Sequence, residues 1–282
     1  MSYRLTDHSH GKERVRVMRV DRRQERQDVS ELDVRITLRG EAFGVAFDRA
    51  DNSTTVATDT MKNLAYVVAA ETGPGPALDY LEALARRFLD LYADIEQVAI
   101  EAWETVWRRM ALNGVEHPHA FTQDGNGQPY LRLVRGQDGD GETVGGVDGR
   151  RVLKSTGSGF TDFVRDRYTS LPETDDRILA SALTARWHYR GLPEDAVADR
   201  TTILAVFDAV FADTYSVSVQ DTMYRMGIAA LDAVPTVDRV SLAMPNLHYL
   251  PTDLGRFGVE DSTFVFVPAA DPHGQIEATV SR

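Results

Sequence analysis

The sequence of 282 residues contains no cysteine. A disulfide framework, a thiolate metal site and a cysteine nucleophile are therefore excluded, and a reducing compartment such as the cytoplasm is expected. The chain also lacks any run of about 18 apolar residues, the length that a membrane span needs. Residues 1–21 are polar and charged, without the apolar segment of a secretion signal. We therefore expect neither a membrane partner nor export.

Positive charge is scarce as well. Acidic side chains number 43 against 31 basic ones, which gives a formal charge of -12, so a nucleic-acid backbone would be repelled and no nucleic-acid partner is expected. Only three of the basic residues are lysines, namely Lys12, Lys62 and Lys154. A codon bias toward arginine is the simplest cause. A retained lysine can nevertheless mark a place where an amine must lose its proton, because a guanidinium does not.

The order of predicted elements repeats once along the chain. Period-2 patterns predict strands, and apolar stripes at helical spacing predict helices. The first half is predicted to contain strands at 14–20 and 34–38, helices at 59–70 and 76–93, and a strand pair at 97–108 and 117–135 that is broken by a turn at 124–127. The second half is predicted to contain strands at 152–155 and 178–189, helices at 201–214 and 219–231, and strands at 239–244 and 263–267.

Two ββααββ halves of this kind favour an α+β fold. Antiparallel sheets would each carry a pair of helices on one face. We place the two domains at residues 1–140 and 141–282. The sheet face opposite the helices must also be covered, and another subunit is the natural candidate.

Several short motifs carry no chemistry on their own. Asp138, Asp140 and Glu142 resemble the start of a calcium loop, but the glycine and the glutamate that such a loop requires are missing at 143 and 149. We therefore expect 136–149 to be a solvated loop. His117 and His119 point to one side of a predicted strand, yet no third ligand is near in sequence, so a structural or hydrogen-bonding role is favoured over a metal site.

Hydrolase and dinucleotide-binding motifs are also missing. The stretch 156–159 lacks the first glycine of a nucleophile elbow, and no glycine-rich fingerprint follows a strand to open a helix.

Polar residues stand at the ends of four predicted elements. Thr58 and Asp59 begin a helix, where a helix cap is the plain interpretation and an anion site is the alternative. Asn246 and His248 lie two residues apart at a strand end and share a face. Arg177 precedes an apolar strand, and Gln220 lies at the start of a helix.

Together these segments resemble the cofactor-free urate oxidases (uricases). The resemblance runs from about residue 10 to the end, with the motifs in the family's order and spacing. The matching stretches are Gly11-Lys12 with Val15-Arg16-Val17, Asp51-Asn52-Ser53 through Val56–Asn63, Val152–Thr156, Phe163–Leu171, Asp176–Leu179, Ser218-Val219-Gln220 with Thr222-Met223-Tyr224, and Pro245–His248. All three lysines fall inside them.

The resemblance implies a tunnelling fold with two ββααββ halves per chain. It further implies a homotetramer that forms a hollow barrel, with active sites at the subunit interfaces. The implied reaction is the oxidation of urate by O2 to 5-hydroxyisourate and hydrogen peroxide. No metal, flavin or haem cofactor takes part.

The resemblance also implies the roles of individual residues. Lys12 would act as the base through the hydroxyl of Thr58, and His248 would complete the proton relay. A lysine can do this if burial or a neighbouring cation lowers its pKa. The substrate-binding residues implied are Thr58 and the backbone of Asp59 from one subunit, and Arg177, Gln220, Phe160, the backbone of Val219, and Asn246, which would hold O2 or water above the purine.

Two departures from the family pattern are visible. His10 stands before Gly11-Lys12, where the family usually has tyrosine. The chain ends Val280-Ser281-Arg282 without the Ser-Lys-Leu peroxisomal signal, so a bacterial cytoplasm is expected.

Two alternatives remain open on sequence grounds. One is a tunnelling-fold relative that acts on pterins or GTP, which often needs a metal held by cysteine and histidine. The other is a purine-binding barrel without urate turnover.

Overall fold

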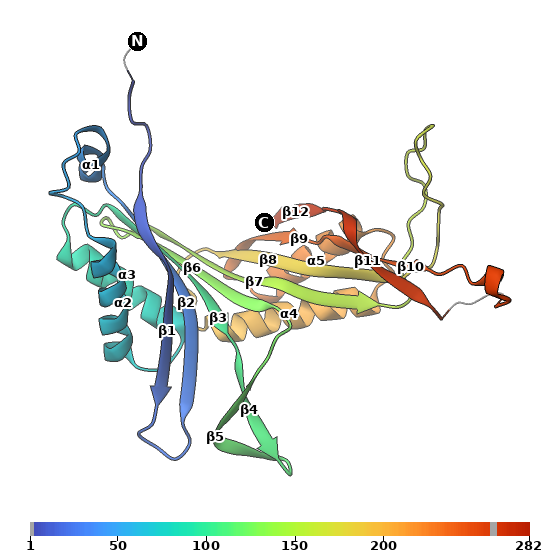
Figure 1. The fold of residues 1–282 in the computed structure, drawn as a ribbon, viewed down its shortest axis with the longest axis horizontal. Helices are drawn as coiled ribbons and strands as arrows, with labels where there is room; N and C mark the ends of the chain where they lie inside the picture. The colour runs from blue at the N-terminus through green and yellow to red at the C-terminus, as the bar shows by residue number, and fades with distance from the viewer. Residues whose placement is uncertain (1–2, 260–263) are drawn as a thin grey trace. The chain divides into compact units, whose positions relative to one another are not determined.

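The computed structural model describes residues 3–259 and 264–282. These residues form two compact units, one of residues 1–146 with 188–197 and the other of residues 147–187 with 198–282. Figure 1 shows the elements of both. The predicted division at residue 140 stays a prediction, while in this structure the short segment 188–197 belongs to the first unit.

The first unit is an antiparallel sheet with two helices on one face. Its strands follow the order β1-β2-β3-β6, with α2 against β1 and α3 against β3 and β6. The core between the sheet and the helices includes Ile36, Met61, Leu84 and Phe88, all fully buried. The elements are β1 (His10–Asp21), β2 (Asp28–Arg39), η1 (Glu41–Phe43), α1 (Gly44–Asp48), α2 (Thr58–Thr72), α3 (Ala77–Leu91), β3 (Gln97–Thr105), β4 (Trp107–Leu112), β5 (Val115–Gln123) and β6 (Gln128–Gly136).

The second unit repeats this plan. Its elements are β7 (Gly141–Lys154), which begins in the first unit, β8 (Leu179–Tyr189), α4 (Ala196–Asp213), α5 (Val219–Ala233), β9 (Val237–Ala243), β10 (Asn246–Pro251), η2 (Gly255–Phe257), β11 (Phe266–Gly274) and β12 (Glu277–Ser281). Strand β9 pairs with β12 and β8, and β8 also pairs with β10. Helix α5 packs on β9 and β12. The packing is close at Gly227, where an added Cβ would lie 2.5 Å from Val280.

Each unit carries a hairpin that the sequence patterns did not predict as a separate feature. In the first unit, β4 and β5 pair with each other, and β3 pairs with β6 across them. In the second unit, β10 and β11 pair with each other while β9 pairs with β12. The twofold ββααββ repeat is therefore present, and each copy has an inserted strand pair between its last two strands.

Two local predictions were wrong. Residues 136–149 are not a long loop, because only a tight turn at 137–140 separates β6 from β7. In that turn the amide of Gly136 donates to the carbonyl of Asp140. The strand expected at 263–267 begins at Phe266 and runs to Gly274, and Thr263 lies outside the described residues.

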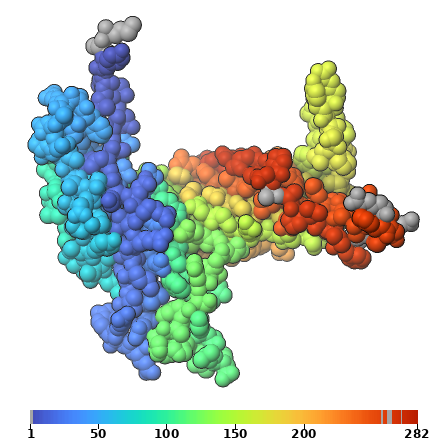
Figure 2. Space-filling model, in the orientation of Figure 1, coloured from blue at the N-terminus to red at the C-terminus, as the bar shows by residue number. Residues whose placement is uncertain are grey.

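The segment between β7 and β8 projects from the body of the second unit (Figure 2). It carries exposed apolar side chains, with Val164 at 93% and Tyr168 at 75% of full exposure. Within the part of the chain described, no helix has the length and apolarity needed to cross a membrane.

Candidate active site

A β-bulge turns Lys12 toward the helices of the first unit. Lys12 lies opposite Ile36 and Val15 lies opposite Val34, so β1 has one more residue than β2 between these two pairs. The extra length includes Arg14, which has a φ of 58°. Because directly opposed residues of a strand pair share a face, Lys12 lies on the face of the buried Ile36. Without the bulge, strict alternation from Val15 would point Lys12 to the other face.

Gly11 is required where β1 approaches β2. A Cβ built on Gly11 would lie 2.1 Å from the carbonyl oxygen of Ile36. Backbone sits in the space that a side chain would need, so no other residue fits without moving the strand. The Gly11-Lys12 pair thus combines a close strand contact with an inward-facing amine.

His10 joins β1 to the segment before α2. Its Nε2 lies 3.2 Å from the carbonyl oxygen of Val56, and its ring packs edge-on against Phe43 at 4.7 Å. Burial lowers the pKa of His10, the hydrogen bond to Val56 raises it, and the neighbouring His8 lowers it. The neutral imidazole donates its Nε2 proton to Val56. His10 lies two residues before Lys12, and Val56 lies two residues before Thr58. The hydrogen bond therefore connects the approaches to both predicted catalytic residues.

The hydroxyl of Thr58 does not cap its helix. Ala57 is the N-cap residue of α2, with no side-chain hydrogen bond to the first turn. Within residues 3–259 and 264–282, the Thr58 hydroxyl makes no hydrogen bond, and the side chain is exposed. The interpretation of Thr58 and Asp59 as a plain helix cap was therefore wrong. The first-turn amides and this hydroxyl are available to an anionic ligand.

Asp59 is held beside the start of α2 by two contacts. Its Oδ1 lies 2.5 Å from Nζ of Lys62, and its Oδ2 accepts a hydrogen bond from Asn63 at 3.0 Å. The Lys62 contact is the main reason that the pKa of Asp59 lies below its usual value, and the charge of Lys12 lowers it further. Strand β1, which carries Lys12, packs against α2.

The three lysines are used differently. Lys62 is paired with Asp59. Lys154 donates to the carbonyl oxygen of Thr214 at 2.8 Å and lies 5.5 Å from the ring centre of Phe211. Burial lowers the pKa of Lys154. Across the described residues, Lys12 alone among the lysines has neither a hydrogen bond nor an ion pair.

The second unit brings Arg177 and Phe160 together. The Arg177 amide donates to Ser158 at 2.8 Å, and the guanidinium lies 5.3 Å from the centre of the Phe160 ring. Phe160 is fixed by two backbone hydrogen bonds with Thr174 and by parallel stacking with Phe163 at 4.9 Å. The Nε atom of Arg177 is buried and has no hydrogen-bond partner within the described residues.

Burial also lowers the pKa of Arg177, and the interaction with Tyr215 raises it. The guanidinium nevertheless stays charged, because its intrinsic pKa is far above neutral. The pair thus offers a cation beside an aromatic face, with a buried donor still free within the described residues.

The start of α5 is connected to the same loop. The Ser216 amide donates to Gly157 at 3.0 Å, and the Gly159 amide donates back to Ser216 at 2.9 Å. Two residues later, Ser218 caps α5 by accepting a hydrogen bond from the Asp221 amide. Val219 and Gln220 are the first residues of that helix, so their amides have no partner within it. This connection holds the start of α5 beside the Phe160 segment.

Asn246 and His248 begin β10 in the second unit. Asn246 lies opposite Ser181 of β8, and Leu247 lies opposite Ala180. The antiparallel register therefore leads β10 toward the end of β8 at which Arg177 stands. On its other side, β10 pairs with β11, and the register changes between Asn246, which lies opposite Gly274, and His248, which lies opposite Ala269.

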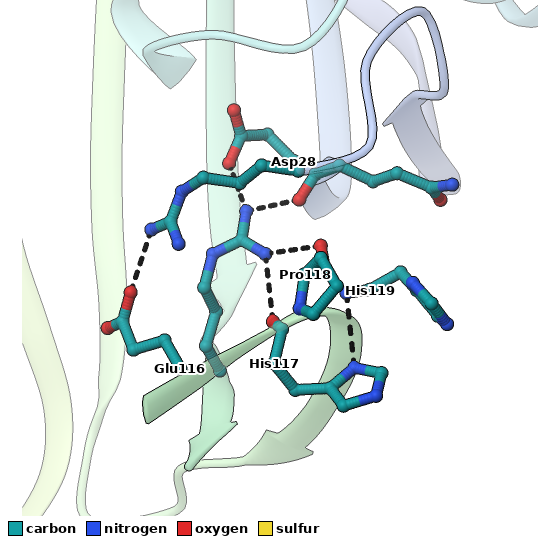
Figure 3. Close-up of polar contacts among 8 residues, drawn as sticks. Asp28, Glu116, His117, Pro118 and His119 are labelled. Carbon is teal, nitrogen blue, oxygen red and sulfur yellow. Dashed lines mark hydrogen bonds and ion pairs between the residues drawn. The ribbon is translucent and has the colours of Figure 1, made fainter. Parts of the chain in front are cut away.

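His117 and His119 belong to a structural cluster on the β4–β5 hairpin (Figure 3). Arg109 donates to the carbonyl of Pro118 at 2.7 Å. Its guanidinium also forms an ion pair with Asp28, the first residue of β2. The two imidazole rings lie 4.5 Å apart, and the His119 amide donates to Nδ1 of His117. Within residues 3–259 and 264–282, no group of three histidine, cysteine, aspartate or glutamate residues could hold a metal.

Comparison with known proteins identifies the family. The sequence profile of the uricases matches residues 8–134 and 143–277. The chain belongs to the uricase family. A uricase from Dictyostelium discoideum is 38% identical over 99% of this chain and 97% of its own length. A uricase from Arthrobacter globiformis is 35% identical over 99% of this chain and 90% of its own length.

The fold agrees with that membership. The crystal structure of the Arthrobacter globiformis uricase matches 100% of this chain and 96% of its own, with a TM-score of 0.94 and 35% identity. The match to the uricase crystal structure confirms the predicted α+β fold with two tandem tunnelling-fold domains. Membership in the uricase family confirms the predicted activity, that of a urate oxidase, which is an oxidoreductase.

The roles of the individual uricase residues stay predictions. Lys12, Thr58 and Asp59 belong to the first unit, whereas Phe160, Arg177, Val219, Gln220, Asn246 and His248 belong to the second. Within the units, the structure packs β1, which carries Lys12, against α2, and it brings Arg177 to Phe160. The sequence patterns gave no role to Tyr215, whose contacts with the Arg177 segment are long-range and have no local signature.

Proposed function

We propose that this enzyme oxidises urate without a metal or an organic cofactor, and that Arg177 and Phe160 hold the substrate. The single observation that carries the binding role is the Arg177 guanidinium beside the Phe160 ring, with a buried Nε that has no partner within the described residues. Urate is a planar anion, which suits a charged fork of donors and an aromatic face. Gln220 and the Val219 amide at the start of α5 would extend the donor set.

Removal of a proton from urate would start the reaction. Thr58 takes the proton from urate and passes its own to Lys12, with His248 completing the relay. The deprotonated purine then gives two electrons to O2. O2 takes up two protons and leaves as hydrogen peroxide, while water adds to the oxidised purine to give 5-hydroxyisourate. Asn246 would hold O2 or water above the ring.

Two structural features support these roles on the side of the base. Thr58 has an exposed hydroxyl that is not used as a helix cap. Lys12 is turned inward by the bulge and carries no ion pair within the described residues. The hydroxyl and the amine are therefore available to take part in proton transfer.

We also propose that the enzyme works in the cytoplasm as a homotetramer with sites shared between subunits. The apolar side chains on the projecting segment between β7 and β8 support assembly, since exposed apolar patches favour protein contacts. The absence of cysteine fits a reducing compartment.

The decisive experiment measures urate consumption by metal-stripped enzyme in a buffer that contains a chelator. We expect the ultraviolet absorbance of urate to fall while O2 is consumed and hydrogen peroxide appears in equal amounts. Metal analysis of the same sample provides the control. Turnover that stops on stripping and returns with one added metal would overturn the cofactor-free proposal. Urate binding without O2 uptake in any sample would instead support a purine-binding relative that lacks turnover.

A further inference from the structure

Tyr215 joins the two segments of the second unit that carry the proposed substrate donors. It lies in the short connection between α4 and α5, five residues before Gln220. Its hydroxyl donates to the carbonyl oxygen of Asp175 at 2.7 Å. Asp175 lies two residues before Arg177. One side chain thus connects the approach to Arg177 with the approach to α5.

The hydroxyl of Tyr215 fits closely at this position. A Cβ added to Gly159 would lie 2.3 Å from the Tyr215 hydroxyl oxygen and 2.9 Å from the carbonyl oxygen of Thr174. The Tyr215 hydroxyl therefore occupies the space that a side chain at position 159 would need. The next residue, Phe160, is the proposed aromatic face, so the hydroxyl lies against the segments of both proposed ring contacts.

The backbone before Arg177 is held by several hydrogen bonds, and the contact with Tyr215 is the one at Asp175. The Arg177 amide is held by Ser158 at 2.8 Å, and Thr174 and Asp176 are joined by a hydrogen bond between the Thr174 hydroxyl and the Asp176 carbonyl at 2.7 Å. Asp175, between them, has its carbonyl fixed by Tyr215. Tyr215 is about half exposed, at 49%, so this residue holds the segment through its hydroxyl contact more than through burial.

We propose that Tyr215 is a positioning residue for urate binding, which sets the place of the Arg177 guanidinium relative to Phe160 and Gln220. This inference rests on the proposed substrate-binding role of Arg177. Tyr215 has no part in the proposed proton transfer, which is assigned to Lys12, Thr58 and His248. Its loss should therefore weaken binding of the ring and leave the proton-transfer step nearly unchanged.

The test replaces Tyr215 by phenylalanine, which removes only the hydroxyl. The dissociation constant of urate is measured without O2, so that binding is separated from turnover, and kcat is measured at saturating urate. We expect the dissociation constant and KM to rise about fivefold, as for the loss of one neutral hydrogen bond, with kcat within about twofold of the parent. Tyr224→Phe makes the same chemical change at an exposed tyrosine of α5 and should leave both constants unchanged.

A double-mutant cycle decides whether Tyr215 acts through Arg177. In an Arg177→Ala background, adding Tyr215→Phe should change the dissociation constant no further, because the group being positioned is gone. An unchanged dissociation constant in Tyr215→Phe, a fall in kcat as large as the rise in KM, or an equal loss in the Arg177→Ala background would overturn the inference. Thermal unfolding and light scattering on each variant show whether the fold and the assembly are intact.

The same measurements separate this inference from the proposed function. If the parent enzyme does not bind urate, or if Arg177→Ala binds urate as the parent does, the proposed substrate role of Arg177 fails. If Arg177→Ala weakens binding while Tyr215→Phe does not, only the positioning role fails.

Discussion

Lys12 and Thr58 have one proposed task, which is to remove a proton. We expect Lys12→Ala and Thr58→Ala to lower kcat roughly 10²- to 10⁴-fold, the usual contribution of a positioned base, and to leave the anaerobic dissociation constant of urate nearly unchanged. Lys12→Arg should be as inactive as Lys12→Ala, since a guanidinium keeps the charge but does not accept a proton. Arg16→Ala, an exposed cation on the same strand, is the control. An active Lys12→Arg enzyme would show that charge alone is needed.

Arg177 has the opposite task, which is to hold the ring. Arg177→Ala should weaken anaerobic urate binding by about 2–5 kcal/mol, the cost of removing one partner of a desolvated charge pair, with a smaller effect on kcat. Isothermal titration without O2 measures this loss. Arg165→Ala removes a guanidinium from the same projecting segment, where it donates to Leu171, and should bind urate normally. Equal losses in both variants would show that only the charge of the segment matters.

His10 should make the stability of the chain depend on pH. Burial holds the pKa of His10 below 6.5, its ordinary value, so the unfolded chain binds this proton at a higher pH than the folded chain does. The stabilisation is therefore complete above 6.5 and is lost as the pH falls toward the folded-state pKa. His10→Gln keeps a donor for Val56 but does not titrate.

The measurement for His10 is the difference in Tm between the parent and His10→Gln at about pH 8 and about pH 5.5. The advantage of the parent should shrink at the lower pH. His10→Tyr, with the residue usual in the family, should behave as His10→Gln does. A difference that stays constant, or grows as the pH falls, would contradict the assigned direction.

At the level of elements, the bulge in β1 determines which face Lys12 occupies. Deleting Arg14 should remove the bulge and leave Lys12 two residues before Val15, so that Lys12 stays on the inward face of the sheet. We therefore expect most of kcat to be retained, with folding judged by circular dichroism. Deleting Glu13 together with Arg14 places Lys12 next to Val15 and should turn it to the opposite face, with a loss of kcat comparable to that of Lys12→Ala. Activity that survives the double deletion would show that the face of the strand does not determine the place of the amine.

The sequence predicted a helix or strand correctly where its apolar stripe packs against the core. In α3 the predicted stripe includes Leu81, Leu84 and Phe88, which are all fully buried. Leu91 was also expected inside but is 56% exposed, because it is the last residue of the helix. The bulge at Arg14 could not be predicted, since residues 10–14 contain no large apolar residue that would mark a change of face.

The inserted hairpins show a second limit of sequence patterns. Most residues of β4 and β5 are exposed or half-buried, so no apolar period marks them. The turn at 124–127 was predicted correctly, yet the strands on its two sides pair with other strands, β5 with β4 and β6 with β3. Pairing depends on contacts far apart in the chain, which local residue types do not encode.

At the scale of the whole molecule, a shared site predicts complementation between inactive chains. Lys12→Ala spoils one half of each proposed site and Arg177→Ala spoils the other. If the halves come from different subunits, refolding an equal mixture should restore about a quarter of the parent sites, as random pairing of two kinds of subunit predicts. The rate of urate oxidation measures the recovery. A mixture with no more activity than its separate components would place each site within one chain.

The molecule as a whole was predictable mainly through the family resemblance. The repeated element order supports an α+β fold, but the roles of Lys12 and Arg177 came from matched motifs and not from their local patterns. Neither the local patterns nor the matched motifs predicted a role for Tyr215, because its partner Asp175 lies 40 positions away in the chain.

Gly11 shows how a residue without any functional group can restrict the variation of an active site. The carbonyl of Ile36 fills the volume in which even a methyl group would have to sit. A library randomised at position 11 should therefore yield functional clones with glycine alone, as narrow a tolerance as at Lys12 itself. Attempts to remodel the surroundings of the base will have to begin at other positions.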